Sequence, residues 1–409
     1  MKKSYIYTII IIVLILILGG MIYFIVKDNN ISNTDFNNPE LFANGSSNSN
    51  KTDVIEVSGN IYSKEEAFTT RDLTQEAELD GATNYTVSDN SDIHITEEGV
   101  YVLTGDAKNT TVYVEAGDED KVDIVLDGVN ITNENFPCIY VKTADKVFIT
   151  TTEKENNLTV SGTFKSDDDI NTDGVIFSRS DITLNGTGTL NINSTDNGIV
   201  SKDDLKITGG TYNITATSKT IEANDSIRIS DGTIVLNAGT DGLHAENEDD
   251  DSLGYIYICG GNITITAGDD GIHGQSVVQI DDGTISINSA EGIEGTYIQI
   301  NGGTININAK DDGINAANKS NSYNTAIEIN DGNIKINMAS GDTDGVDSNG
   351  DIYVNGGTID VTGNSTFDYD GTAEFNGGTI IVNGSEVDTI PNQMMGGGKG
   401  EMNGNPRNR

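Results

Sequence analysis

Hydrophobic and polar residues recur in one fixed order between Gly198 and Gly384, where a single line of sequence is repeated about eight times. Each copy is centred on a Gly-Gly or Asp-Gly pair, as in LKITGGTYNITA, IQINGGTININA and IYVNGGTIDVTG. The copies follow one another at intervals of about 21–22 residues wherever no insertion intervenes. A constant interval of this length predicts a solenoid, in which every copy forms one coil and the coils stack.

Within each copy, apolar residues alternate with polar ones. Ile298 and Ile300, for instance, flank Gln299. This two-residue period is typical of strands with one buried face. A second signature, Asp-Gly or Glu-Gly followed by an aliphatic residue, begins a third short strand, as at residues 270–272 and 291–293. Because one coil alone cannot bury its isoleucine stripe, three strands and three turns per coil predict an all-β parallel β-helix of about ten stacked coils.

The chain outside the repeats divides into further segments. Residues 5–26 are uncharged, overwhelmingly apolar and long enough to cross a bilayer, and two lysines precede them. We therefore predict an uncleaved transmembrane signal anchor, with a cleaved signal peptide as the alternative. The complete division is a cytoplasmic tip at 1–4, the transmembrane helix at 5–26, a flexible linker at 27–53, the β-helix at 54–387 and a disordered tail rich in Gly, Asn and Met at 388–409.

Composition narrows the classes of partner. The 409 residues carry a formal net charge of −41. This charge excludes nucleic acid as a partner, because phosphate binding needs a basic surface. It favours a soluble, cation-binding domain outside the cytoplasm. The anchor makes the membrane a partner of the N-terminal helix, and the sequence predicts no protein partner.

Carboxylates recur at equivalent positions of successive coils, just before the glycine of the second signature and two residues after it. Since stacked strands lie about 4.8 Å apart, these side chains form ladders, and stacked like charges are destabilising. A hard cation with oxygen ligands would stabilise them, and outside the cell we expect Ca²⁺. The alternative is plain turn chemistry, in which Asp caps its turn and Gly takes a positive φ. The candidate metal ligands are Asp241, Asp269, Asp270, Glu291, Glu294, Asp311, Asp312, Asp344 and Asp347.

Two histidines stand in the same ladder. His244 and His273 become neighbours if the acidic insertion at residues 246–253 loops out of the coil. Paired histidines could ligate a transition metal. The alternative is that they are polar surface residues or hydrogen-bond partners of the surrounding carboxylates.

The outward position of the first strand forms a further ladder, which we expect to bind carbohydrate. Tyrosine, glutamine and charged side chains on a flat sheet suit sugar hydroxyls and ring faces, although an ordinary solvated face is the alternative. Lys206 and Arg228 could also act as the base of a β-eliminating lyase, but no further sign of catalysis is present. The candidate carbohydrate-binding residues are Lys206, Arg228, Tyr257, Gln279, Gln299 and Tyr353.

Several stretches go beyond a generic solenoid. Residues 136–150, 198–216 and 254–272, together with the Met-Gly-Asn tail, resemble a family of bacterial extracellular carbohydrate-binding proteins that is similar to polysaccharide lyases. The resemblance implies a right-handed parallel β-helix that binds cellulose and acidic plant polysaccharide without established catalysis. It also implies calcium between coils, held by acidic turns that match Asp241, Asp269, Asp270, Asp311 and Asp312. The chain departs from the pattern at residues 219–221, where the Asp-Gly pair is lost.

Together these observations predict a calcium-binding, non-catalytic polysaccharide-binding protein of the bacterial cell membrane. It would be single-pass, with the β-helix displayed outside the cytoplasm. The first alternative is a calcium-dependent lyase of the pectate type. The second is a structural or adhesive solenoid of the cell surface.

Overall fold

The computed structural model describes residues 54, 55, 57, 59–341 and 343–392. The predicted anchor and linker lie outside this part of the chain, as does most of the predicted tail. Among the residues that are described, no helix has the length and apolar character needed to cross a membrane. Within the predicted tail, the described residues 388–392 contact the β-helix: Ile390 is buried against the core and the Asn392 amide donates to the Tyr369 carbonyl.

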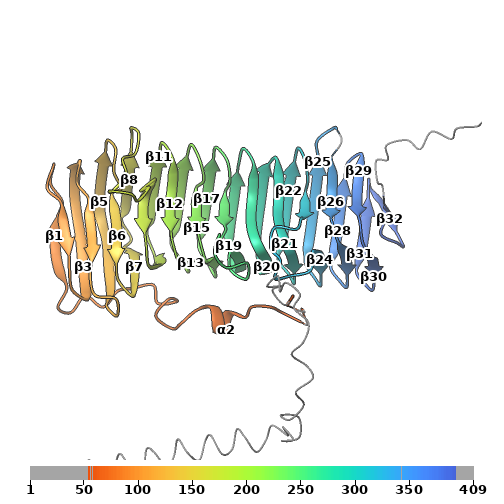
Figure 1. The fold of residues 1–409 in the computed structure, drawn as a ribbon, viewed down its shortest axis with the longest axis horizontal. Coiled ribbons are helices and arrows are strands. Elements are labelled where there is room, and N and C mark those ends of the chain that lie inside the picture. The colour runs from red at the N-terminus through yellow and green to blue at the C-terminus, as the bar shows by residue number, and fades with distance from the viewer. Residues whose placement is uncertain (1–53, 56, 58, 342, 393–409) are drawn as a thin grey trace, which may run out of the picture. The chain divides into compact units, whose positions relative to one another are not determined.

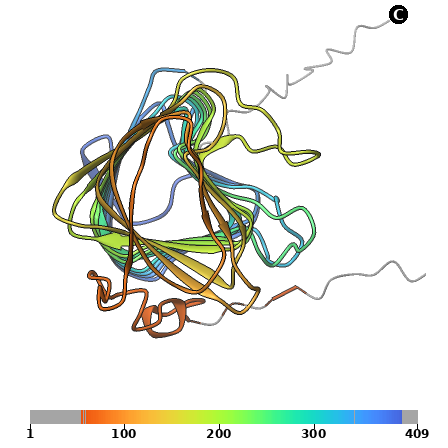
Figure 2. The ribbon, with the colours of Figure 1, turned by 90° about the vertical axis from the view of Figure 1, so that its left-hand side faces the viewer.

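The described chain winds into stacked coils whose strands pair in parallel with those of the next coil (Figure 1). The strands form three columns, one for each side of the coil, which Figure 2 shows end-on. Three strands, β19 (Tyr255–Thr266), β20 (Asp270–Ser289) and β21 (Glu291–Ile300), bend through turns and contribute to more than one column.

The first column follows the strand before the Gly pair. Apart from the bent strands it contains β1 (Thr83–Thr86), β3 (Gly99–Lys108), β5 (Lys121–Asn133), β7 (Lys146–Thr151), β10 (Asp181–Gly186), β13 (Asp204–Ile207), β16 (Ser226–Ile229), β24 (Ala326–Ile329), β27 (Asp351–Val354) and β30 (Ala373–Phe375).

The second column follows the strand after the Gly pair. It contains the later parts of β3 and β5, then β8 (Glu155–Val160), β11 (Thr189–Ser194), β14 (Thr211–Ala216), β17 (Thr233–Ala238), β22 (Thr304–Ala309), β25 (Asn333–Met338), β28 (Thr358–Thr362) and β31 (Thr379–Val382). Beyond it, β32 (Ser385–Val387) pairs with β31 antiparallel.

The third column begins at the acidic signature. It contains β2 (Ile93–Ile95), β4 (Val112–Glu115), β6 (Ile139–Thr143), β9 (Gly174–Ser178), β12 (Asn197–Ser201), β15 (Ile221–Ala223), β18 (Leu243–Ala245), the first parts of β20 and β21, β23 (Ile314–Ala316), β26 (Asp344–Ser348) and β29 (Ser365–Tyr369).

The all-β architecture of parallel, stacked strands is confirmed. The described columns have more members than the ten coils expected, because the irregular strands from β1 onward also complete coils. The right hand of the winding stays a prediction. Inward aliphatic side chains stack in register, as Ile256 on Ile227 and Ile298 on Val278, and all four are fully buried. Each such side chain contributes roughly 1.5–3 kcal/mol of burial free energy.

The two glycine signatures serve different purposes. Glycines of the central pair, such as Gly210 and Gly303, adopt φ values of 88° and 87°, which favour glycine. Gly292 of the acidic signature does not have a positive φ. Instead, a Cβ atom there would lie 2.2 Å from the carbonyl oxygen of Gly313 on the next coil. The positive φ that the alternative of plain turn chemistry requires at the acidic signature is therefore absent at Gly292, where glycine is required for close packing of the coils.

A segment before the first coil returns along the β-helix. Residues 59–75, named here the N-terminal strap, include the one-turn helix α2 (Lys64–Ala67) and lie along the first column (Figure 1). The strap extends along the first column as far as β21, where the Gln299 side chain donates a hydrogen bond to the Gly59 carbonyl. It determines which faces of the β-helix are accessible.

Candidate functional site

The predicted carbohydrate surface of the first column lies beneath the N-terminal strap. Lys206, Tyr257, Gln279 and Gln299 are all less than a tenth exposed, and Arg228 is half-buried. The expectation of an open face is therefore wrong for these residues. Alternation showed correctly that the side chains leave the lumen, but the strap covers them where solvent was expected.

The strap is held by the polar groups that we expected to bind sugar. The Gln279 side-chain oxygen accepts hydrogen bonds from the backbone N–H groups of Ile61 and Tyr62, at 3.0 and 2.8 Å. Its amide nitrogen donates to the Tyr62 carbonyl at 2.9 Å. The Tyr62 ring stacks on Tyr255, with centroids 4.2 Å apart. The strap thus forms an additional layer on the outward face of the first column. The Gln279 side chain is hydrogen-bonded to this layer, and its Tyr62 ring packs on an aromatic ring of the column.

Asp72 is the buried anchor of the strap. Its carboxylate is fully buried and lies 2.6 Å from the Lys146 ammonium and 3.3 Å from that of Lys206. Burial alone would raise the pKa of Asp72, but these two lysines and the Thr69 backbone hold that pKa well below its usual range. The carboxylate is therefore ionised and neutralises two cations that the sheet alone would leave unpaired.

This arrangement removes both predicted lyase bases from the surface. Burial and the neighbouring cations lower the pKa of Lys206, yet its amine faces Asp72 within the protein. The Arg228 guanidinium is paired with Asp204 at 2.6 Å and donates to the Ala67 carbonyl of the strap. Neither group is placed to take a proton from a polysaccharide while the strap is docked.

Tyr353 is the one predicted carbohydrate-binding residue that stays half-exposed beyond the strap. It lines a cavity of about 280 Å³ together with Tyr297, Glu328 and Asn355. Its hydroxyl donates to Asp351 at 3.0 Å. Because Tyr297 is itself buried, this small cavity offers much less aromatic area than the platform that we expected.

The third column carries a ladder rich in charged side chains, of which His244, His273 and Glu294 are buried. The outward side chains on successive coils are directly opposite one another, as the spacing from the acidic signature predicts. The ladder runs in the order Val200, Glu222, His244, His273, Glu294, Asn315, Asp347 and Asp368. The register of this ladder is confirmed in full.

The first half of the ladder is neutralised by the protein's own cations. Glu222 lies 3.0 Å from the Lys202 ammonium and 3.2 Å from that of Lys219. Burial would raise its pKa, but the two lysines outweigh this and lower it. Farther along, Glu294 is paired with Lys319 at 2.9 Å.

The two histidines continue this neutralised half. His244 places Nδ1 2.9 Å from Asp241, and His273 places Nδ1 3.0 Å from Asp270 and 2.7 Å from Glu294. Burial would lower the pKa of His273, but its two carboxylate partners outweigh this and raise the pKa to about 9. Asp241, Asp270 and Glu294 therefore have nitrogen partners already, which reduces their need for calcium.

The second half of the ladder lacks such cations. In the described chain, Asp312, Asp347 and Asp368 form no ion pair with a lysine, arginine or histidine. Burial, followed by repulsion from neighbouring carboxylates such as Asp344, raises the pKa of Asp347 to about 7. Burial likewise raises the pKa of Asp312 to about 6. Charge at this end of the column is thus left uncompensated.

Unsatisfied oxygen atoms occur in this same half. The side-chain Oδ1 atoms of Asn315 and Asp368 are buried without a hydrogen-bond partner. Both residues are register neighbours of Asp347. Carboxylate and amide oxygens are the ligands that Ca²⁺ prefers, so the residues present fit a hard cation.

The remaining predicted metal ligands are distributed around this ladder. Glu291 accepts a hydrogen bond from the Asn315 amide at 3.0 Å, and burial raises its pKa to about 7. Asp344 follows Asp312, whose side chain accepts from the Asp344 backbone N–H at 3.1 Å. Asp269 and Asp311 are exposed at the turns before the third column, away from the buried carboxylates.

A cleft opens beside the neutralised half. It has a volume of about 630 Å³ and is lined by Lys202, Lys219, Glu222 and His244 on one side, and by the acidic insertion, including Glu246 and Asp250, on the other. Lys202 and Lys219 were not among the predicted site residues. The signal was present, because Lys219 occupies the coil that has lost its Asp-Gly pair.

The second column presents a different surface. Its outward positions are mostly threonine, asparagine and serine, and most are exposed. Amide ladders connect the coils, with Asn213 donating to Asn191 at 2.8 Å and Asn337 donating to Asn308 at 3.1 Å. The result is a flat array of hydroxyl and amide groups with few charges.

Comparison with known proteins yields three findings. A family model described as "Carbohydrate-binding domain-containing protein" matches residues 89–296 and 292–389. A protein of the same description from Acetivibrio thermocellus is 41% identical over 123 residues, which are 29% of this chain and 43% of that protein. The chain thus matches less than half the length of this relative.

The third finding is structural. The polysaccharide lyase-like protein from C. thermocellum, solved as a gadolinium derivative, is similar with a TM-score of 0.51 and 32% identity. The similarity covers 53% of this chain and 96% of that one.

Proposed function

The chain belongs to the family of carbohydrate-binding domain-containing proteins, and from this premise we propose that it binds acidic polysaccharide along the third column with the help of Ca²⁺. The glycan would lie in the cleft beside Lys202 and Lys219. Calcium would occupy the second half of the ladder, near Asp347. The protein would be non-catalytic and displayed outside a bacterial membrane by the anchor at residues 5–26, on a right-handed β-helix.

The observation that carries this proposal is the division of the ladder. One half has lysines and histidines among its carboxylates. In the other half, Asp312 and Asp347 have raised pKa values and pair with no cationic side chain of the described chain. The Oδ1 atoms of Asn315 and Asp368 there are buried without a hydrogen bond. Asn315, Asp347 and Asp368 would hold the ion, with Asp312 and Asp344 adjacent. The similar lyase-like structure is a gadolinium derivative, and gadolinium, like calcium, is a hard cation that takes oxygen ligands.

Electrostatic repulsion explains why the proposal needs both the two lysines and a calcium ion. A protein with a net charge of −41 repels polyanions over its whole surface. Lys202 and Lys219 share the single carboxylate of Glu222, and each ammonium has three donors, so both keep capacity for a uronate carboxylate. A bound calcium ion would remove the repulsion farther along the column.

A second candidate surface suits a neutral glycan such as cellulose. The second column is flat and repeats its hydroxyl and amide groups on every coil, about 4.8 Å apart. Such an array matches an ordered chain of sugar hydroxyls better than a soluble polyanion.

Binding measurements with matched variants test both surfaces. We would compare soluble polygalacturonate and insoluble cellulose, each with calcium and with chelator. The Lys202→Ala, Lys219→Ala double variant should lose polygalacturonate binding, whereas Lys335→Ala, on the second column, should retain it. Thr284→Arg should weaken only cellulose binding. An unsaturated product that absorbs in the ultraviolet would favour the lyase alternative over the non-catalytic proposal. If every variant binds both glycans as the parent does, neither surface is the binding site.

A further inference from the structure

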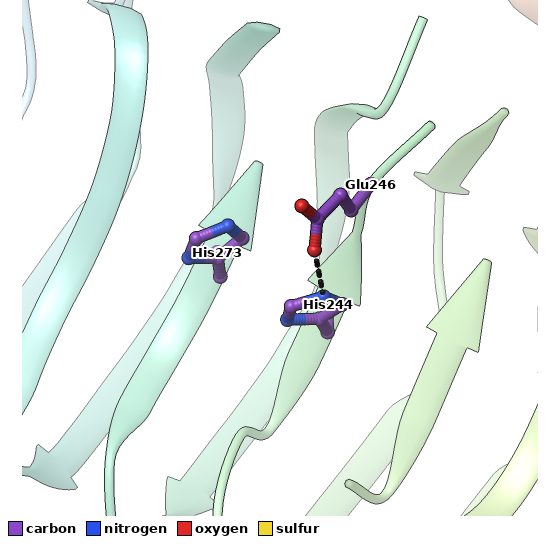
Figure 3. Close-up of side chains that lie close together, drawn as sticks. All are labelled: His244, Glu246 and His273. Carbon is purple, nitrogen blue, oxygen red and sulfur yellow. Dashed lines mark hydrogen bonds and ion pairs between the residues drawn. The ribbon is translucent and has the colours of Figure 1, made fainter. Parts of the chain in front are cut away.

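His244 and His273 meet on neighbouring coils of the third column (Figure 3). Their rings are stacked, with centroids 4.6 Å apart and planes inclined by 12°. Glu246, at the start of the acidic insertion, brings its carboxylate within 3.2 Å of His244 Nε2. One potential ligand atom from each of these three residues lies within 4.8 Å of the other two.

A carboxylate lies beside Nδ1 of each ring. At His273 this contact is a hydrogen bond, whereas Nδ1 of His244 is close to its carboxylate without forming one. Each histidine turns Nδ1 to the aspartate three residues before it, Asp241 in one case and Asp270 in the other. Because the rings are nearly parallel and similarly oriented, their Nε2 atoms lie along the same edge of the stack. Histidines that bind metals commonly present the other ring nitrogen to a carboxylate in this way.

We propose that His244, His273 and Glu246 form a site for a borderline divalent transition-metal ion such as Zn²⁺. Two ligand atoms at about 2.0–2.1 Å from one ion, at a tetrahedral angle, are about 3.3 Å apart. The separation of His244 Nε2 and Glu246 is already 3.2 Å. Only the ligand atom of His273 must approach, and it already lies within 4.8 Å of the other two ligand atoms.

The chemistry of the ligands separates this site from the calcium site. Imidazole nitrogen suits zinc, copper and nickel, whereas calcium takes oxygen ligands. The ion would displace the proton on Nε2 of each histidine, which would pass to solvent, while Nδ1 of His273 stays beside Asp270 and Glu294. The proposal does not depend on glycan binding, because every group that it requires belongs to the protein.

The site has a structural consequence for the cleft. Both histidines are buried on the coil, whereas Glu246 is half-exposed on the inserted loop. The same loop forms one wall of the cleft. A bound ion would therefore fix the loop to the coil and define that wall.

Titration of Zn²⁺ into chelator-stripped full-length protein tests the proposal, with millimolar calcium present throughout. We expect one ion per chain, and Co²⁺ in its place should show the visible absorption of a four-coordinate complex. His244→Gln and His273→Gln should each weaken binding at least about a hundredfold, and Glu246→Gln about tenfold. The chain has three histidines, so His94→Gln, in β2, is the matched control and should bind like the parent.

Glu246→Gln keeps the test meaningful if a histidine variant folds poorly, because its side chain is on an exposed loop. Unchanged zinc affinity in Glu246→Gln and in both histidine variants would overturn the proposal. So would full competition by calcium, since that would indicate a non-specific acidic surface.

Discussion

The stability of the β-helix should fall as the pH rises from 5 to 8 in chelator, and calcium should restore it. Asp347 has a pKa of about 7 in the folded protein, against 3.8 for an ordinary aspartate. The folded state therefore binds more protons than the unfolded state between these values. Since the free energy of unfolding falls with pH wherever the folded state binds more protons, the loss is complete only above pH 7.

The contribution of Asp347 to this loss of unfolding free energy follows from its pKa shift. A pKa about three pH units higher in the folded state corresponds to about 4 kcal/mol. Asp347 is half-buried, and solvent screening reduces this to about 2 kcal/mol. Calcium at one hundred times its Kd adds about 2.7 kcal/mol to the folded state. One bound ion can thus offset the whole penalty.

Scanning calorimetry at pH 5 and pH 8, with calcium or chelator, measures both effects. Asp347→Asn should reduce the pH dependence in chelator, leaving the part that comes from Asp312, Glu291 and His273, and should lose most of the stabilisation by calcium. Asp360→Asn removes the same charge from the second column and should behave like the parent. A parent whose melting temperature in chelator is equal or higher at pH 8 would refute the reasoning, as would calcium stabilisation that survives in Asp347→Asn.

Three further predictions concern packing. Asp72→Ala leaves Lys146 and Lys206 buried and unpaired, at a cost of about 3–5 kcal/mol, so hydrogen exchange of strap amides should accelerate at least about a hundredfold; unchanged protection would contradict this. Gln279→Ala should loosen the strap but leave polygalacturonate affinity within about twofold, because the residue is covered. Gly292→Ala should lower stability by about 1–3 kcal/mol, whereas Gly341→Ala, with no contact under 3.4 Å, should be neutral in calorimetry.

The sequence predicts the coils well because their signals are local. Alternation around Gln299 and the repeated acidic signature determine which side chains enter the lumen and which coils face one another. The strap has no comparable signal. Its contact with Gln279 joins residues more than two hundred positions apart, and residues 59–75 show neither a clear helical nor a clear strand period. A pattern of alternation indicates that a residue leaves the core, but not what covers it.

The candidate site was predictable in register but not in charge balance. The repeat alone presents every acidic turn as equivalent, whereas Lys219, His244 and His273 are departures from it, and the protein's own cations enter the column there. At Asp312 and Asp347, where no lysine or histidine stands in the column, the carboxylates keep raised pKa values and the neighbouring oxygens stay unsatisfied. A lysine or histidine within the column therefore indicates where the protein supplies its own counter-charge. A run of carboxylates without such residues indicates where we propose that an ion supplies it.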